Sequence, residues 1–334
     1  MKEALLWKSL ENKAVQCNLC NHRCKIQEGK KGICQVRENR DGALYSLNYG
    51  KVVALHVDPI EKKPLFHFYP GSTAFSVAAS GCNFRCTFCQ NYSISQSPRE
   101  DRINGQKLSP VELVALAKSH GCHTIAHTYT EPTIYFEHAI ESARLAHAEG
   151  LRTVFVTNGF MSREAAEMMV GVVEGLNIDL KAFSEETYKK TIGGQLQPVL
   201  DNIKFFHEQG MLVEVTTLVV PDMNDSDEEL GKIASYICSV SPDIPWHVSR
   251  FHPDFEMLDR RATPTATVQK ARNIGLEAGL RYVYCGNLPG DDGESSLCHS
   301  CGAMLVKRWG YRIMQNNLDG KKCPSCGTEH HFIV

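Results

Sequence analysis

The chain has 334 residues, and its 36 lysines and arginines nearly balance its 38 aspartates and glutamates, which leaves a formal net charge of −2. A hydrophobic content of 43% at this length is enough to bury a large core, which excludes a mainly disordered chain. The near-neutral charge argues against a broad nucleic-acid-binding face. No leader-like apolar run follows Met1 and no stretch of about 18 apolar residues occurs, so we expect a cytoplasmic protein with no membrane partner.

The unusual feature of the composition is its 14 cysteines, of which only Cys122, Cys238 and Cys285 stand apart from clusters. In a reducing compartment, clustered cysteines indicate metal ligands rather than disulfides. The three isolated cysteines fit buried structural thiols, although Cys285 lies at a predicted strand end.

Residues 1–71 contain the first cluster and no long helical period, so we predict a metal-binding module followed by a linker. The ligands favour zinc, with an accessory iron–sulfur cluster as the alternative, and His22 is an alternative ligand. The predicted ligands are Cys17, Cys20, Cys24 and Cys34.

Residues 72–290 repeat an apolar, β-rich run followed by an amphipathic helical stretch, about six times. This order predicts parallel strands joined by helical crossovers. We expect strands at Thr73–Ala79, Thr124–Tyr129, Arg152–Thr157, Leu176–Leu180, Leu212–Val220, Trp246–Phe251 and Arg281–Cys285.

The expected helices begin at capping signals, among them Ser109 before Pro110, and Ser226 with Glu229 three residues later. Six or seven strand–helix units suit a barrel with missing units, an open partial barrel or a doubly wound sheet. In all three folds the chemistry lies at the carboxyl ends of the strands, where the polar residues of this sequence also fall.

The loop after the first of these strands places Cys82, Cys86 and Cys89 within eight residues. Tetrahedral zinc needs a fourth ligand, and the neighbouring Gln90 and Asn91 are poor zinc ligands. Three thiolates instead suit a cubane iron–sulfur cluster with one open iron, to which a cofactor or substrate can bind.

This spacing, with Phe88 before the last cysteine, resembles the signature of radical S-adenosylmethionine (SAM) enzymes. The resemblance implies a partial (β/α)6-type TIM barrel and a [4Fe-4S] cluster whose open iron binds SAM. Electron transfer then cleaves SAM to a 5′-deoxyadenosyl radical that abstracts hydrogen from a substrate. It also implies that Phe88 packs near the adenine.

Further segments resemble strand-end motifs of this superfamily and of activases such as pyruvate formate-lyase activase. Glu131, in Tyr129-Thr130-Glu131-Pro132, matches a glutamate that contacts the SAM ammonium, although it also suits a helix cap. Asn158 and the pair Asp179 and Lys181 match further positions that contact SAM or substrate, although the pair also suits a solvated ion pair.

The expected sixth strand runs into Arg250 and His252. His247 or His252 would contact SAM, and Arg250 would hold a substrate anion. Side chains alternate along a strand, so His247 and Arg250 cannot both point inward. Lys181, His247 and Arg250 are the candidates for catalytic residues.

Residues 291–334 contain two cysteine-x2-cysteine pairs, each followed by glycine. This spacing predicts a zinc ribbon with a closed four-thiolate site. Lys307–Arg312 between the pairs fits either a partner- or RNA-binding strip or a solvated hairpin. The predicted ligands are Cys298, Cys301, Cys323 and Cys326.

The whole arrangement, with module, barrel and ribbon at 1–71, 72–290 and 291–334, resembles the AmmeMemoRadiSam system radical SAM enzyme. That family implies Memo-type and AMMECR-type partners. The activase resemblance favours a protein or peptide substrate and a reductant such as flavodoxin or ferredoxin. The rival hypotheses are an RNA-modifying radical SAM enzyme and a zinc-binding scaffold without iron.

Overall fold

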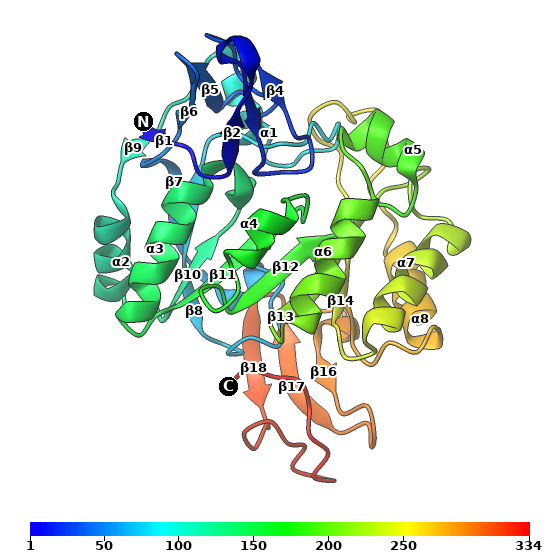
Figure 1. The fold of residues 1–334 in the computed structure, drawn as a ribbon. Helices are drawn as coiled ribbons and strands as arrows, with labels where there is room; N and C mark the ends of the chain where they lie inside the picture. The colour runs from blue at the N-terminus through cyan, green and yellow to red at the C-terminus, as the bar shows by residue number, and fades with distance from the viewer.

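The computed structural model describes residues 1–334, and its centre is a nine-stranded sheet in the order β15-β14-β13-β12-β11-β10-β8-β7-β9 (Figure 1). The strands from β8 to β15 in this order pair in parallel, whereas β7 pairs antiparallel with both β8 and β9. The strands are β7 (Lys51–Pro59), β8 (Thr73–Ala79), β9 (Gln106–Lys107), β10 (Thr124–His127), β11 (Arg152–Thr157), β12 (Gly175–Asp179), β13 (Leu212–Val219), β14 (Trp246–Arg250) and β15 (Val283–Gly286).

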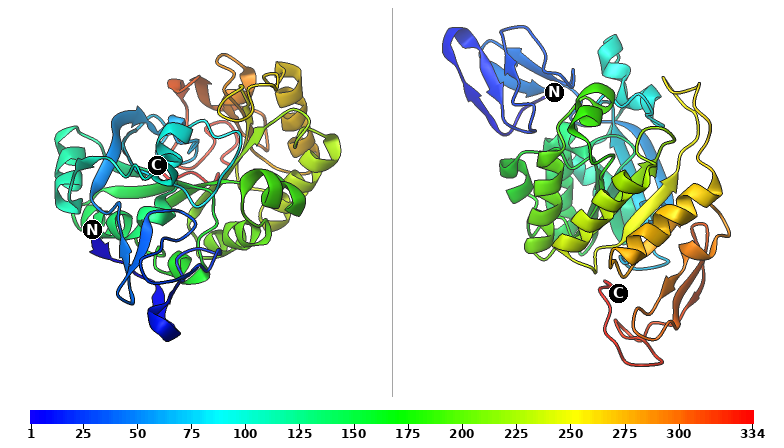
Figure 2. Two further views of the ribbon diagram at one scale, coloured as in Figure 1. Left: turned by 90° about the horizontal axis from the view of Figure 1, so that it is seen from above. Right: turned by 90° about the vertical axis from the view of Figure 1, so that its right-hand side faces the viewer.

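Helices follow these strands and cover the outer side of the curved sheet (Figure 2). Because the sheet ends at β15 and β9 without closing, the fold is the partial barrel that the sequence predicts. The α-helices are α1 (Tyr92–Ser95), α2 (Pro110–Ser119), α3 (Phe136–Ala148), α4 (Arg163–Glu167), α5 (Glu185–Thr187), α6 (Gln197–Glu208), α7 (Asp227–Val240) and α8 (Thr265–Glu277). Shorter turns of helix are η1 (Glu11–Lys13), η2 (Ile60–Lys62), η3 (Ser97–Glu100), η4 (Pro132–Tyr135), η5 (Tyr188–Ile192) and η6 (Asp292–Glu294).

The predicted helix starts are confirmed by side-chain caps. Ser109 accepts a hydrogen bond from the Glu112 backbone while Glu112 reaches back to the Ser109 backbone, which forms a capping box on α2. Ser226 caps α7 by accepting a hydrogen bond from the Glu229 backbone. Local signals therefore determine where these helices begin.

The main core is a cluster of 55 buried residues that spans the barrel strands and the helices outside them. Trp246 on β14 is fully buried against α8, where Gly275 leaves room for its ring. None of the helices combines the length and apolarity that a membrane-spanning helix requires.

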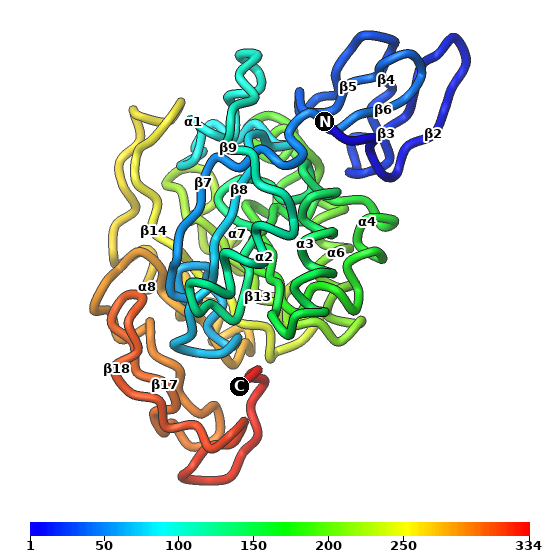
Figure 3. Tube along the Cα trace, turned by 90° about the vertical axis from the view of Figure 1, so that its left-hand side faces the viewer, coloured from blue at the N-terminus to red at the C-terminus, as the bar shows by residue number.

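The N-terminal residues form two small three-stranded sheets against one side of the barrel (Figure 3). Their strands are β1 (Lys2–Glu3), β2 (Trp7–Ser9), β3 (Val15–Cys17), β4 (Lys25–Ile26), β5 (Arg37–Arg40) and β6 (Ala43–Ser46). Arg37 docks them onto α3 through a buried two-pronged ion pair with Glu137, at 2.7 and 2.9 Å. β7, which lies within the expected segment 1–71, is paired with β8 in the main sheet.

The C-terminal residues form the antiparallel sheet β16 (Ser296–Leu297), β17 (Met304–Trp309) and β18 (Arg312–Asn316), at the opposite end from the N-terminal strands (Figures 1 and 3). A backbone bridge between Phe68 and Ile333 ties the chain end to the segment between β7 and β8. Arg308 is buried there, with its guanidinium 4.2 Å from the Phe66 ring centre and a hydrogen bond to the Phe66 carbonyl.

Candidate active site

A cavity of about 570 Å³ lies inside the partial barrel and reaches the carboxyl ends of its strands. The structure brings together there most of the site residues expected from the sequence. The expected residues that line the cavity are Cys82, Cys86, Phe88, Cys89, Glu131, Asn158, Asp179, Lys181 and His247.

Cys82, Cys86 and Cys89 line one part of this cavity, on the loop between β8 and α1. Gly81 begins the loop with a φ of +114°, and a Cβ there would lie 3.1 Å from Val36 and 3.2 Å from Ile134. All three thiols are free, and burial raises the pKa of Cys86 to about 12. A bound cation would be needed to hold such thiols as thiolates, so the donor set and the open cavity beside it fit a three-thiolate iron–sulfur cluster.

Glu131 follows β10 and is held by four hydrogen bonds from three neighbouring residues. Oε1 accepts from the Thr133 backbone and from the hydroxyls of Thr133 and Thr157, and Oε2 accepts from the Asn158 backbone at 2.8 Å. Glu131 therefore does cap η4, and it also lines the cavity. Since Oε2 receives a single bond, it keeps capacity for a further donor such as an ammonium group.

Tyr129, two residues before Glu131, also lines the cavity. Its φ is +64°, in the left-handed region that favours glycine. The Tyr129 hydroxyl donates to buried Asp58, and the Lys63 ammonium lies 4.4 Å from the Tyr129 ring centre. These contacts stabilise Tyr129 in a left-handed backbone conformation that is unusual for a residue other than glycine.

Asp179 is the last residue of β12, Lys181 lies two residues further on, and the two form an ion pair at 2.9 Å. Both line the cavity, and their side chains are only partly exposed, so they are not an ordinary solvated surface pair. Burial alone lowers the pKa of Lys181, but the neighbouring Asp179 carboxylate raises it, and the pKa is raised overall. Lys181 is therefore a fixed positive charge, 6.0 Å from the centre of the Phe88 ring.

Asn158 connects the Cys82 loop to the Glu131 carboxylate. Its side-chain Nδ2 donates to Asn83 Oδ1 at 2.7 Å and lies 3.8 Å from Cys82 Sγ, while its backbone binds Glu131. One residue at the end of β11 thus positions both groups.

His247 and Arg250, both on β14, point to different sides of the strand. His247 lines the cavity, and its Nε2 donates at 2.7 Å to Glu214, a carboxylate buried on β13. Arg250 does not line the cavity, and its Nε donates to the carbonyl of buried Thr263. The expected contact of Arg250 with a substrate anion therefore stays a prediction, and the cavity lining does not include this residue.

No pattern in the sequence indicates that residues from both flanking segments line the same cavity. Glu61 and Phe66 come from the segment between β7 and β8, and Tyr311 comes from the turn between β17 and β18. Glu214 had a visible signal, because it is a charged residue inside the apolar run Leu212–Val219. Cys285 also lines the cavity, at the end of β15.

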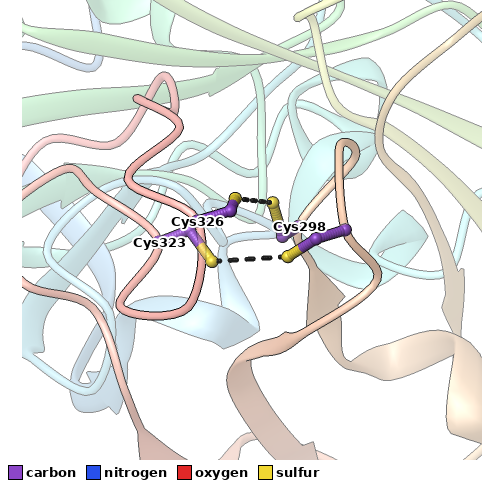
Figure 4. Close-up of side chains that lie close together, drawn as sticks. Cys298, Cys323 and Cys326 are labelled. Carbon is purple, nitrogen blue, oxygen red and sulfur yellow. Dashed lines mark hydrogen bonds between the residues drawn. The ribbon is translucent and has the colours of Figure 1, made fainter.

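A second group of thiols, in the C-terminal sheet, is gathered closely enough to hold a single metal ion. The sulfur atoms of Cys298 and Cys326 are 3.6 Å apart, those of Cys301 and Cys323 are 3.7 Å apart, and all four lie within 4.8 Å of one another (Figure 4). Zn–S bonds of about 2.3 Å in a tetrahedron separate sulfur atoms by about 3.8 Å, so this spacing suits zinc.

Comparisons with known proteins agree with this geometry. A model described as the Radical SAM superfamily matches residues 77–234. The chain is 42% identical to a Methanocaldococcus jannaschii protein, Uncharacterized protein MJ0808, over 100% of both chains. It is 24% identical to GTP 3′,8-cyclase of Limosilactobacillus fermentum, over 69% of this chain and 74% of the relative.

Pyruvate formate-lyase-activating enzyme of Streptococcus mutans is 25% identical, over 49% of this chain and 65% of the relative. The structure of Streptococcus suis SuiB bound to S-adenosylmethionine is similar in fold, with a TM-score of 0.50 and 14% identity over 63% of this chain and 49% of SuiB. The chain belongs to the radical SAM superfamily, whose cofactors are a [4Fe-4S] cluster and SAM.

Proposed function

We propose that this protein is an enzyme that reductively cleaves SAM and abstracts hydrogen from a protein or peptide substrate. The observation that carries the proposal is the meeting of three free thiols from one loop with a carboxylate and an ion pair from neighbouring strand ends, all around one cavity. When bound, the cluster and SAM supply a 5′-deoxyadenosyl radical.

The residues of this chain have separate roles in the proposal. Cys82, Cys86 and Cys89 hold the cluster through three irons. Oε2 of Glu131 accepts a hydrogen bond from the SAM ammonium, and Lys181 supplies a positive charge for a carboxylate. The remaining proposed SAM contacts are Phe88, Asn158, Asp179 and His247.

The activating-enzyme relative supports a macromolecular substrate, since its name describes action on another enzyme. Segments 1–71 and 291–334 both contribute residues to the cavity wall, which suits docking of a partner at its edge. This proposal includes Memo-type and AMMECR-type partners and a flavodoxin- or ferredoxin-like reductant. It also includes the division of the chain into three parts. We further propose a structural zinc ion at Cys298, Cys301, Cys323 and Cys326.

The two rival hypotheses have less support. An RNA-modifying enzyme would use the strip Lys307–Arg312, but Arg308 is buried under Phe66 and is not free to bind RNA. The zinc scaffold predicts no iron, whereas the superfamily to which the chain belongs has an iron–sulfur cofactor.

The test is to measure 5′-deoxyadenosine after anaerobic reconstitution, with SAM and dithionite, for the native chain, Cys86→Ala and Cys238→Ser. We expect product from the native chain and from Cys238→Ser, whose thiol lies on α7 outside the cavity, and a loss of at least about 100-fold in Cys86→Ala. Equal product from Cys86→Ala, or none from native protein with a verified cluster, would refute the proposal.

A further inference from the structure

The four N-terminal cysteines line one small cavity of their own. Cys17 ends β3, Cys20 and Cys24 lie on the loop before β4, and Cys34 lies on the loop before β5. All four thiols are free, and the rest of the wall is largely apolar, with Leu19, Ile26 and Ile134 among its residues. Four thiols that line one cavity are a complete donor set for a metal centre.

The spacing of these thiols differs from that of the C-terminal zinc-like site. In the whole chain, only the C-terminal cysteines are gathered closely enough for one ion to reach three or more of them. Neither the N-terminal cysteines nor Cys82, Cys86 and Cys89 have three sulfur atoms gathered closely enough for one ion. In a cubane cluster each thiolate binds a different iron, so its cysteines stand farther apart than cysteines around a single zinc ion.

Two buried hydrogen-bond donors beside this cavity have no partner. Arg37 is 1% exposed and gives both terminal nitrogens to Glu137, but its Nε is unpaired. Asn83 is 0% exposed, and its Nδ2 is also unpaired. Both residues line the cavity. A buried N–H without a partner is costly, and the sulfur atoms of an iron–sulfur cluster accept such hydrogen bonds.

We propose that Cys17, Cys20, Cys24 and Cys34 bind a second [4Fe-4S] cluster, with one thiolate on each iron. Because every iron then has a protein ligand, this cluster would not bind SAM. It goes beyond the SAM-cleavage proposal, since it needs neither SAM nor a substrate. His22 is not required as a ligand, and its Nε2 donates instead to the Asn83 carbonyl at 2.8 Å.

We expect the second cluster to lie close to the first. Asn83 lines the N-terminal cavity, and Cys82, which precedes it in the sequence, lines the barrel cavity. The walls of the two cavities therefore include consecutive residues of one loop, so we expect two paramagnetic clusters there to affect each other's spectra.

The first test is the metal content of the full chain after anaerobic reconstitution with iron and sulfide. We expect about eight iron, eight sulfide and one zinc per native chain, and about four iron and four sulfide in Cys82→Ala/Cys86→Ala/Cys89→Ala. About four iron and two zinc in the native chain, or an iron-free triple variant, would overturn the inference.

The second test combines Cys20→Ser and Cys34→Ser with the triple variant, and compares it with a matched control that adds Cys238→Ser instead. We expect the four iron atoms that remain in the triple variant to be lost when Cys20→Ser and Cys34→Ser are added, and to be kept when Cys238→Ser is added. The far-ultraviolet circular dichroism should be the same in both variants. The iron, sulfide and zinc content of the native chain does not depend on whether these variants fold. Iron retained without Cys20 and Cys34 would contradict the assignment.

A third measurement, electron paramagnetic resonance of the reduced protein, tests how close the clusters are. We expect the native spectrum to be broadened by spin–spin interaction relative to the spectra of Cys82→Ala/Cys86→Ala/Cys89→Ala and Cys20→Ser/Cys34→Ser. If the spectrum of the native protein equalled the sum of the spectra of the two variants, the clusters would not be close to each other. Because none of these readouts involves SAM cleavage, a failure here is distinct from a failure of the proposed function.

Discussion

At the scale of single residues, the site depends on buried carboxylates that hold other groups in place. Glu131 is surrounded by donors from η4 and β11, and Glu214 binds both His247 and the backbone of His67. The sequence identified Glu131 and His247 by type and position. It did not identify Thr157 or Glu214 as their partners, because such contacts join strands that are distant in the chain.

His67 is the residue whose titration is most clearly coupled to folding. It is fully buried, stacks on Phe332 and shares a hydrogen bond with the Tyr284 hydroxyl, and burial lowers its pKa from 6.5 to about 3. Between these pH values the unfolded chain binds a proton that the folded protein does not. His67 therefore makes the protein less stable as the pH falls below about 6.5.

We expect the native protein to lose about 1.4 kcal/mol from this residue between pH 7.5 and pH 5.5, and His67→Gln to lack that part of the loss. Chemical denaturation at both pH values measures the difference. Identical pH dependence in the two proteins would show that His67 does not titrate with folding. His120, which is exposed at the end of α2, provides the control substitution His120→Gln.

At the scale of elements, strands and helix starts followed from local signals. β8 and β11 begin and end at the predicted residues, β13 and β14 end one residue earlier than predicted, and β12 begins and ends one residue earlier than predicted. The pairing of β7 with β8 did not follow, because an antiparallel partner has no local sequence marker. The burial of Arg308 was also hidden, because strand alternation in a short hairpin does not say which face meets the barrel.

Gly275 lies at the contact of α8 with β14. A Cβ at this position would be 2.8 Å from both Trp246 and Val283, whose side chains are buried and cannot move freely. We expect Gly275→Ala to destabilise the protein by about 1–3 kcal/mol, despite the better helix propensity of alanine. Chemical denaturation measures the change.

The matched control is Gly231→Ala in the neighbouring helix α7. A Cβ there meets no atom within 4 Å, so the substitution should stabilise the protein by about 0.5–1 kcal/mol through helix propensity alone. The two substitutions thus have opposite expected signs. A stabilised Gly275→Ala protein would contradict the tight packing of Trp246 on α8.

At the scale of the whole molecule, the N-terminal module is held to the barrel by a buried charge pair. Glu137 on α3 accepts two hydrogen bonds from Arg37 and a third from the Leu5 backbone. Because removal of one partner leaves the other charge buried without compensation, we expect Glu137→Gln to cost about 3–5 kcal/mol. The free energy of unfolding, followed by tryptophan fluorescence, measures this cost.

Lys118→Met is the comparison variant, since Lys118 pairs with Glu149 on the exposed surface. Exposed ion pairs contribute little, so the stability of this variant should stay close to that of the native protein. If Glu137→Gln behaved like Lys118→Met, the buried pair would not be what holds the module in place.

The sequence by itself determined the order of strands and helices, the three-cysteine loop and the cysteine sets at both ends, because these depend on local periodicity and spacing. Only the tertiary structure decided that Glu61 and Tyr311 share a cavity with Cys82, that Arg250 is outside it, and that the N-terminal and C-terminal thiols differ in spacing. These outcomes depend on which surfaces of distant segments pack together, and no local pattern in the chain encodes such contacts.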